Sequence, residues 1–182
     1  GQRRALLDDV YHDSLWLIDM VENLLTITHF DEGTVKLTLN SELIDDIFEA
    51  AVSHLANQAG EHRIVIEPAE EILLVRIDAS LIIQVLTNLV GNAIKYTPNG
   101  GAITMTVEEK EGMAHLSVTD EGIGISPEAL PHIFDRFFRA DESRTRQTGG
   151  SGLGLSIAKW IVERHGGWFD VVSRQNVGTK MT

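Results

Sequence analysis

The sequence predicts an α+β fold with two layers, one of strands and one of helices. Segments with the two-residue alternation of strands occur between segments with helical periodicity, without the regular βαβ alternation of a doubly wound fold. Residues 79–96 are apolar around most of a helical surface, which predicts a helix buried on most sides. Residues 102–109 and 113–119 alternate on either side of a glycine-containing turn, which predicts an antiparallel hairpin.

Composition places the chain among globular proteins of ordinary domain size. It has 182 residues, of which 43% are hydrophobic and 23% charged. The net charge of −12 argues against a nucleic-acid partner, and the lack of cysteine excludes disulfides and thiolate metal sites. No apolar run approaches the roughly 18 residues needed to span a bilayer, and no signal peptide is recognisable. Because the chain begins in a helical pattern, we expect it to be part of a longer protein.

Residues 2–29 predict one long amphipathic helix, which the segment 31–33 ends. Its apolar residues follow heptad spacing, interrupted by Asp13. A helix cannot bury such a stripe by itself, so we expect a helical hairpin or an oligomeric bundle, with packing on its own domain as the alternative. The heptad residues are Leu6, Val10, Leu17, Met20, Leu24 and Ile27.

The following elements are expected from local signals. Ser41 and Asp78 are residues typical of helix N-caps, and residues 97–101 form a strong turn signal. Strands are predicted at 34–39, 63–67, 72–77, 102–109, 113–119 and 168–173, with one more beginning at 177; helices are predicted at 42–58, 79–96, 127–132 (short) and 151–165.

The helix at 79–96 carries an ordered row of polar residues. Gln84, Asn88, Asn92 and Lys95 share one face at about 100° per residue. Carboxamide oxygens can ligate a hard cation and a lysine can meet an anion, so the row favours a site for a metal and a phosphate. The alternative is a polar stripe that faces water.

Two glycine-rich segments could also contact a ligand. Asp120 follows directly on a strand, where its carboxylate could accept from an exocyclic amine such as that of adenine, and the glycines after it allow a close backbone approach. Residues 149–155 open the last helix, whose backbone N–H groups could bind an anion. This segment is neither a Walker A loop nor a dinucleotide fingerprint. Each segment alone could be an ordinary turn.

Between these segments, residues 135–146 contain four arginines and three acidic residues in an otherwise acidic chain. A loop with phenylalanines at its root and arginines along it is typical of a lid over a phosphate tail. A solvated charged loop with core phenylalanines is the alternative.

Five short motifs occur in an order that one protein family shares. They are NLVGNAIKY, DEGIGI, FDRFFR, GGSGLGL and the closing pair Gly178 and Thr179. Their order and spacing resemble the N, G1, F, G2 and G3 boxes of sensor histidine kinases, which belong to the ATPase superfamily shared with DNA gyrase B, mismatch-repair MutL and the cytosolic heat-shock chaperone. The resemblance covers residues from about 34 to the end.

The resemblance implies a Bergerat-type ATP-binding fold, in which a mixed sheet of about five strands packs on three helices. The long helix before it is similar to the second helix of the family's dimerisation hairpin. On this basis residues 1–31 would be that helix, 32–40 a linker strand and 41–182 the ATP-binding catalytic domain.

The resemblance also implies a role for each matching position. Asn92 would ligate the Mg²⁺ that bridges the phosphates of ATP, and Asn88 would lie beside the phosphates. Lys95 would contact a phosphate, Tyr96 would pack near the adenine, and Asp120 would read its amine. Further nucleotide contacts are expected at Gly122, Gly124, Ile125, Phe138, Arg139, Gln147, Gly150, Ser151, Gly152, Leu153, Gly154, Leu155 and Thr179.

Phosphoryl transfer would involve Asn88 and Lys95 together with Arg139 and Arg144 of the lid. Arg136 and Gln147 are also candidates for the γ-phosphate contact, and nothing in the sequence ranks them.

The chain departs from the patterns of the superfamily in two respects. Hydrolytic members place a glutamate, the base for water, where this chain has Asn88. A carboxamide is a poor general base, so water activation is disfavoured, which suits transfer to an imidazole. The family's phosphoacceptor box is missing, because His12 and Asp13 lack the following arginine and proline; we interpret His12 as an ordinary helix residue.

The resemblance therefore implies a protein-histidine kinase domain that uses ATP and Mg²⁺. It would phosphorylate a histidine on a dimerisation helix absent from this chain, for relay to the receiver domain of a response regulator. The full protein would be a homodimer, with this domain in the cytoplasm and the membrane reached only through upstream segments. The alternatives are a Ser/Thr protein kinase similar to anti-sigma factors and a non-catalytic nucleotide-sensing dimerisation module.

Overall fold

The computed structural model describes residues 14, 21, 36–69, 71–140 and 151–182. The predicted helix at 2–29 lies outside the described residues, apart from positions 14 and 21. Among the described residues, no helix combines the length and apolar character needed to cross a membrane. The elements are β1 (Asn40–Leu43), α2 (Ile44–His54), β2 (Arg63–Glu67), β3 (Leu74–Ile77), α3 (Ala79–Tyr96), β4 (Ala102–Lys110), β5 (Met113–Asp120), η1 (Leu130–His132), α5 (Gly154–Arg164), β6 (Val171–Arg174) and β7 (Gly178–Met181).

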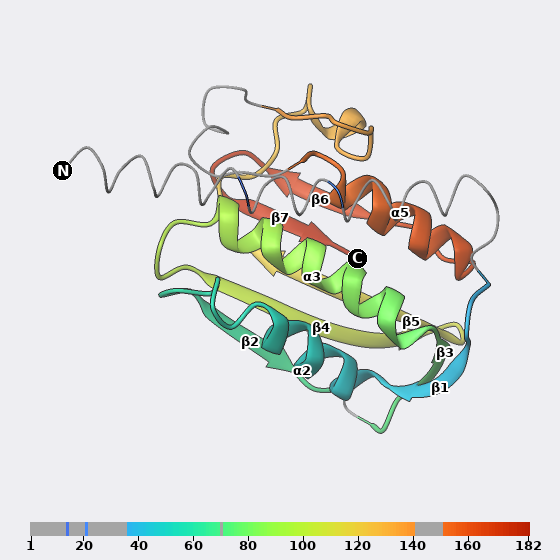
Figure 1. The fold of residues 1–182 in the computed structure, drawn as a ribbon. Helices are drawn as coiled ribbons and strands as arrows, with labels where there is room; N and C mark the ends of the chain where they lie inside the picture. The colour runs from blue at the N-terminus through green and yellow to red at the C-terminus, as the bar shows by residue number, and fades with distance from the viewer. Residues whose placement is uncertain (1–13, 15–20, 22–35, 70, 141–150) are drawn as a thin grey trace.

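A five-stranded mixed sheet forms one layer, in the order β2-β4-β5-β7-β6. The β2–β4 pair is parallel and the other pairs in this sheet are antiparallel. Helices α2, α3 and α5 lie across one face of this sheet, with α3 in contact with both of the others (Figure 1). The predicted two-layer α+β fold, with about five strands on three helices, is therefore confirmed.

The core lies between the sheet and the helices because each contributes one apolar face. Along β4 the alternate residues Ile103, Met105 and Val107 are buried, as the period of a strand requires. Phe48 of α2 is fully buried, and α3 buries six of its residues. This apolar packing fixes the central helix against the sheet, and so fixes the position of its polar row.

The predicted boundaries of α3 are correct. Asp78 is its N-cap, and its Oδ1 accepts a hydrogen bond from the backbone N–H of Leu81 at 3.4 Å. The β4–β5 hairpin turns at Glu111 and Gly112, which both have positive φ (54° and 76°), as a tight turn between twisted strands requires.

The prediction for residues 34–43 was wrong. Residues 36–39 are irregular, and the strand lies instead at β1, which pairs antiparallel with β3 in a separate two-stranded sheet. Ser41 lies in β1 opposite Arg76, and α2 begins after Leu43 without a side-chain cap. The backbone N–H of Ile44, which a cap at Ser41 was expected to serve, donates instead to the carbonyl of Leu73 at 3.3 Å.

Three helix boundaries also differ from their predictions. Helix α2 ends at His54 rather than 58, and the short helix at 127–132 is reduced to η1. Helix α5 begins at Gly154 rather than at 151, near the end of the glycine-rich segment 149–155.

Candidate functional site

The polar row of α3 lies beside the start of α5. Gln84, Asn88, Asn92 and Lys95 are all half-buried, in a helix whose other faces carry the buried core residues. The Asn88 Nδ2 group donates a hydrogen bond to the carbonyl oxygen of Gly154 at 3.0 Å. This bond joins two predicted site segments that are 66 positions apart in the sequence.

The start of α5 is built for close contact with α3. A Cβ atom at Gly154 would lie 3.4 Å from the carboxamide of Asn88, so this position leaves little room for a side chain. Leu153, fully buried, is the N-cap residue and provides no side-chain hydrogen bond to the first turn. Within the described part of the chain, the N-cap position of this helix therefore leaves the first N–H groups without a capping side chain, as an anion-binding helix end requires.

Asp120 ends β5 on the helix-facing side of the sheet, opposite Thr179 of β7. Its Oδ1 accepts the backbone N–H of Gly122 at 2.8 Å, and the carboxylate also accepts the backbone N–H of Thr179. Burial raises the pKa of Asp120 above its ordinary value, although these two hydrogen bonds act in the opposite direction. The carboxylate is thus held rigidly in a partly dry environment.

The turn after Asp120 is held between α3 and the β6–β7 turn. The backbone N–H of Ile123 donates to the carbonyl of Tyr96 at 3.1 Å. A Cβ at Gly122 would lie 2.6 Å from that carbonyl oxygen, and one at Gly124, where φ is +67°, would lie 2.2 Å from the carbonyl oxygen of Arg174. Both glycines are therefore required by close backbone approach.

Two cationic side chains lie near Tyr96 at the end of α3. The Lys95 ammonium lies 5.2 Å from the centre of the Tyr96 ring. Burial raises the pKa of the Tyr96 hydroxyl, and the nearby Arg139 guanidinium partly opposes that shift. In a chain with a net charge of −12, this local positive charge favours an anionic ligand.

The aromatic residues at the root of the predicted lid pack near α5. The rings of Phe134 and Phe169 lie 5.1 Å apart, and those of Phe138 and His132 lie 5.6 Å apart. The backbone N–H of Phe137 donates to the carbonyl of Gly152 at 3.0 Å. Arg144, Gln147 and Gly150 lie outside the described residues, so their predicted contacts stay predictions.

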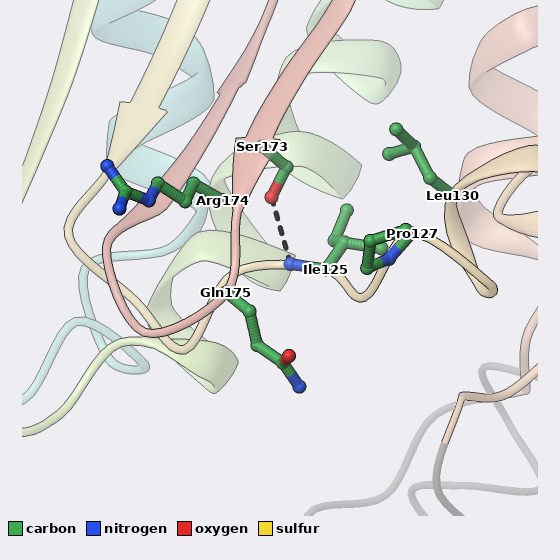
Figure 2. Close-up of a pocket in the computed structure, with 6 residues that line it drawn as sticks. All are labelled: Ile125, Pro127, Leu130, Ser173, Arg174 and Gln175. Carbon is green, nitrogen blue, oxygen red and sulfur yellow. Dashed lines mark hydrogen bonds between the residues drawn. The ribbon is translucent and has the colours of Figure 1, made fainter.

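A pocket of about 350 Å³ lies next to Ile125 and the β6–β7 turn (Figure 2). It contains one predicted nucleotide contact, Ile125, and neither the carboxamide row nor Asp120. We therefore do not assign it to the site described above. Its lining residues are Ile125, Pro127, Leu130, Ser173, Arg174 and Gln175.

Sequence reasoning missed Ser173, a residue of β6 that contacts two predicted site segments, the turn after Asp120 and the closing pair Gly178 and Thr179. Its hydroxyl accepts the N–H of Ile125, donates to the carbonyl of Gly178, and lies 2.9 Å from the hydroxyl of Thr179. A serine in a short strand carries no signal of such a role, because its partners are set by strand pairing.

Comparisons with known proteins identify the family to which the chain belongs. Residues 77–182 match the family described as Histidine kinase-, DNA gyrase B-, and HSP90-like ATPase. Sensor protein KdpD of Clostridium acetobutylicum is 40% identical over 177 residues, which are 97% of this chain and 20% of that protein. Sensor histidine kinase YkoH of Bacillus subtilis is also 40% identical over 177 residues, covering 97% of this chain and 38% of that protein. The structure of the mycobacterial sensor histidine kinase MprB, 27% identical, has a TM-score of 0.69 and covers 79% of this chain and 94% of its own.

The chain belongs to the family of histidine kinase-, DNA gyrase B- and HSP90-like ATPases. Within that family it is an ATP-binding catalytic domain of the kind found in sensor histidine kinases. YkoH and MprB, both named above, carry that name. It spans less than half the length of the curated relatives reported above.

Proposed function

We propose that this domain binds ATP with Mg²⁺ and transfers the γ-phosphoryl group to a histidine on a dimerisation helix. The observation that supports this most directly is the bond between Asn88 and Gly154, which puts the carboxamide row of α3 beside the uncapped start of α5. A cation held by carboxamide oxygens and an anion held by helix N–H groups would then be neighbours, as Mg²⁺ and a polyphosphate require.

The donor chemistry of the row fits Mg²⁺. Within the described residues, no group of three or more His, Cys, Asp or Glu side chains is placed to hold a metal. Mg²⁺ commonly takes one or two protein oxygens and completes its shell with substrate phosphates and water, so the carboxamide of Asn92 would suffice as the protein ligand. The ion would neutralise charge on the phosphates.

The chain's own residues would bind and position the nucleotide. Asp120 would accept from the amine of adenine, and Lys95 and Arg139 would face the phosphates. Asn88 cannot act as an effective base toward water, which favours transfer to an acceptor imidazole over hydrolysis. Catalysis would rest on positioning and charge neutralisation, as in other phosphoryl transfers.

The partners of the whole protein belong to the same proposal. The acceptor helix would come from a dimerisation hairpin shared by two protomers, and an aspartate of a response regulator's receiver domain would take the phosphoryl group. The domain would lie in the cytoplasm as part of a membrane-anchored sensor. The names of the relatives support a sensor role.

The test combines this chain with ATP labelled at the γ-phosphate, MgCl₂ and a purified dimerisation hairpin that carries an acceptor histidine. We expect label on the hairpin that is lost in acid and kept in base, as the N–P bond of phosphohistidine dictates. The chain alone should bind ATP in calorimetry without labelling itself. Asn92→Ala should abolish Mg²⁺-dependent binding and labelling, whereas Asn57→Ala, at an exposed turn, should change neither.

Each contrary result has a definite meaning. Robust label on the chain alone would mean that the phosphoacceptor lies within this chain and not on a separate dimerisation helix. Acid-stable label on serine or threonine of a partner would favour the Ser/Thr kinase alternative, and ATP binding without transfer would favour a nucleotide sensor. The relatives and structures compared above lend no support to either alternative.

A further inference from the structure

Ser173 lies at the junction of three segments near Asp120. Its hydroxyl oxygen lies 2.9 Å from the backbone nitrogen of Ile125, 3.1 Å from the carbonyl oxygen of Gly178 and 2.9 Å from the hydroxyl oxygen of Thr179. Figure 2 shows the bond to Ile125. Ser173 and Thr179 are paired residues of neighbouring strands, and Thr179 is paired in turn with Asp120. The three side chains therefore form a row across β6, β7 and β5.

The chemistry of the three partners fixes the direction of each hydrogen bond. A serine hydroxyl has one hydrogen and two lone pairs. The Ile125 N–H can only donate, so it occupies one lone pair, and the Gly178 carbonyl can only accept, so it takes the hydrogen. Only the second lone pair remains, so the Thr179 hydroxyl must donate its hydrogen to Ser173.

This direction decides what Thr179 can offer to a ligand. With its hydrogen committed to Ser173, the Thr179 hydroxyl has only lone pairs left and acts as an acceptor. Its neighbour Asp120 is also an acceptor, because its carboxylate carries no hydrogen when ionised. Two adjacent acceptors match an amino group with two N–H donors, and they oppose a carbonyl oxygen at the same place.

We infer that Ser173 is a positioning residue that holds the Thr179 hydroxyl as an acceptor and thereby favours a 6-amino purine over a 6-keto purine. This inference rests on the proposed ATP site. Ser173 would not touch the base; it would act through the direction of one hydrogen bond. This arrangement depends on the sheet, because the pairing of β6, β7 and β5 brings the three side chains together.

The test compares ATP with inosine triphosphate. In inosine triphosphate a keto oxygen replaces the 6-amino group of adenine, and N1 carries a hydrogen. Dissociation constants are measured by calorimetry with Mg²⁺ for the unchanged chain and for Ser173→Ala. The unchanged chain should prefer ATP by about tenfold or more, since a keto oxygen facing two acceptors is left unpaired. In Ser173→Ala the Thr179 hydroxyl can turn and donate, so the preference should fall by about threefold or more.

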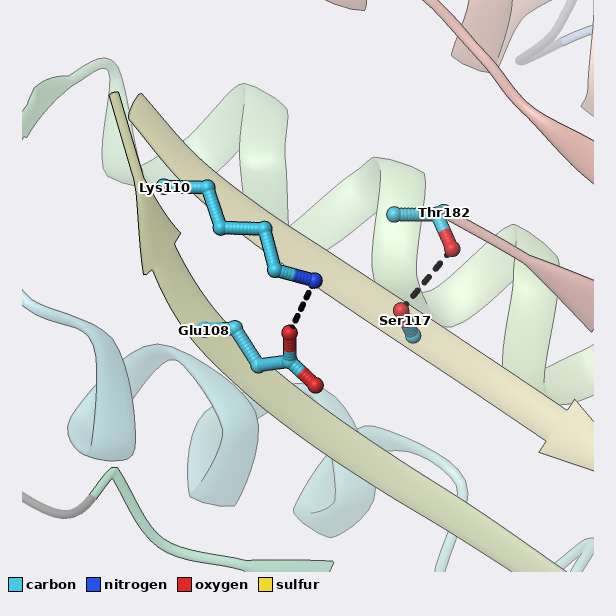
Figure 3. A network of polar contacts seen from close by, with 4 residues as sticks. All are labelled: Glu108, Lys110, Ser117 and Thr182. Atoms are coloured by element: carbon cyan, nitrogen blue, oxygen red, sulfur yellow. Dashed lines mark hydrogen bonds and ion pairs between the residues drawn. The ribbon is translucent and has the colours of Figure 1, made fainter. Parts of the chain in front are cut away.

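A matched control is available on the other face of the same sheet. The Ser117 hydroxyl of β5 is bonded at 2.9 Å to the hydroxyl of Thr182, the residue just after β7 (Figure 3). Ser117→Ala removes a comparable hydroxyl–hydroxyl bond away from the site, and it should leave the preference for ATP over inosine triphosphate unchanged. In a Thr179→Val background, Ser173→Ala should no longer alter the preference, because its effect passes through the Thr179 hydroxyl.

The outcomes separate this inference from the proposed function. If Ser173→Ala weakens both nucleotides equally, or alters the preference as much in the Thr179→Val background, Ser173 has only a structural role. If the unchanged chain binds both nucleotides equally well, the inference fails while the proposed ATP site stands. If the unchanged chain binds neither, the proposed function fails as well.

Discussion

At the scale of single residues, the pKa of Asp120 is set by effects that act in opposite directions. Burial disfavours its charge, while the N–H groups of Gly122 and Thr179 favour it, and the net result is a raised pKa. The folded chain therefore holds the Asp120 proton more tightly than the unfolded chain does. The stability that this proton contributes is present at low pH and is lost as the pH rises from the ordinary value of 3.8 through the raised pKa.

Nucleotide binding should show the opposite pH dependence. An adenine amine needs the ionised carboxylate, so ATP affinity should fall as the pH is lowered through the raised pKa of Asp120. Calorimetric titrations across the acidic range would measure this change. Asp120→Asn should bind ATP more weakly at neutral pH and should lack this part of the pH dependence. Any pH dependence that remains in this variant comes from the titration of ATP itself and serves as the reference. An identical pH profile in both proteins would remove Asp120 from the base contact.

At the scale of elements, α3 is held at its N-terminus by groups from distant segments. Asp78 Oδ2 accepts the backbone N–H of Thr38 at 3.0 Å, and its own backbone N–H donates to His165 Nε2 at 3.1 Å. His165 Nδ1 lies 2.8 Å from the carbonyl of Ile161, so it carries the ring hydrogen while Nε2 accepts. One histidine thus links the end of α5 to the start of α3.

Loss of this link should destabilise the domain. His165→Ala leaves the Asp78 N–H without its partner, and an unpaired polar group of this kind costs about 1–3 kcal/mol. Urea denaturation should therefore show a lower midpoint with an unchanged slope. His54→Ala, at the exposed end of α2, is the matched control and should leave the midpoint nearly unchanged. Equal midpoints for both variants would contradict the proposed link.

At the scale of the whole molecule, the described core is contained within the predicted catalytic domain. Its buried apolar residues lie between Ile44 and Met181, and they form one cluster between the sheet and the helices. The contact between Thr38 and Asp78 adds the segment just before β1 to this unit. The boundary of an independently folding domain should therefore lie before Thr38.

A chain that begins at residue 36 should fold and bind ATP as the full chain does. We expect a single cooperative thermal transition and an unchanged ATP affinity, since no described core residue is removed. Differential scanning calorimetry and isothermal titration would measure the two properties. A broad transition or a loss of ATP binding would mean that residues 1–35 are part of the domain.

The sequence alone determined the elements whose signals are local. Helix α3 was predictable residue by residue because its apolar periodicity, the Asp78 cap and the turn at 97–101 all lie within or beside it. The β4–β5 hairpin followed from alternation around a glycine turn for the same reason. Asp120 could be proposed as an acceptor because it stands at the end of a strand before glycines.

The tertiary structure decided whatever depends on contacts between distant residues. It moved the first strand to β1, because pairing with β3 outweighed the local signal for a cap at Ser41. It joined Asn88 to Gly154 and placed Ser173 beside Thr179, contacts that no periodicity encodes. Local patterns fix the backbone of each segment, whereas the direction of a hydrogen bond between two strands exists only once the sheet has formed.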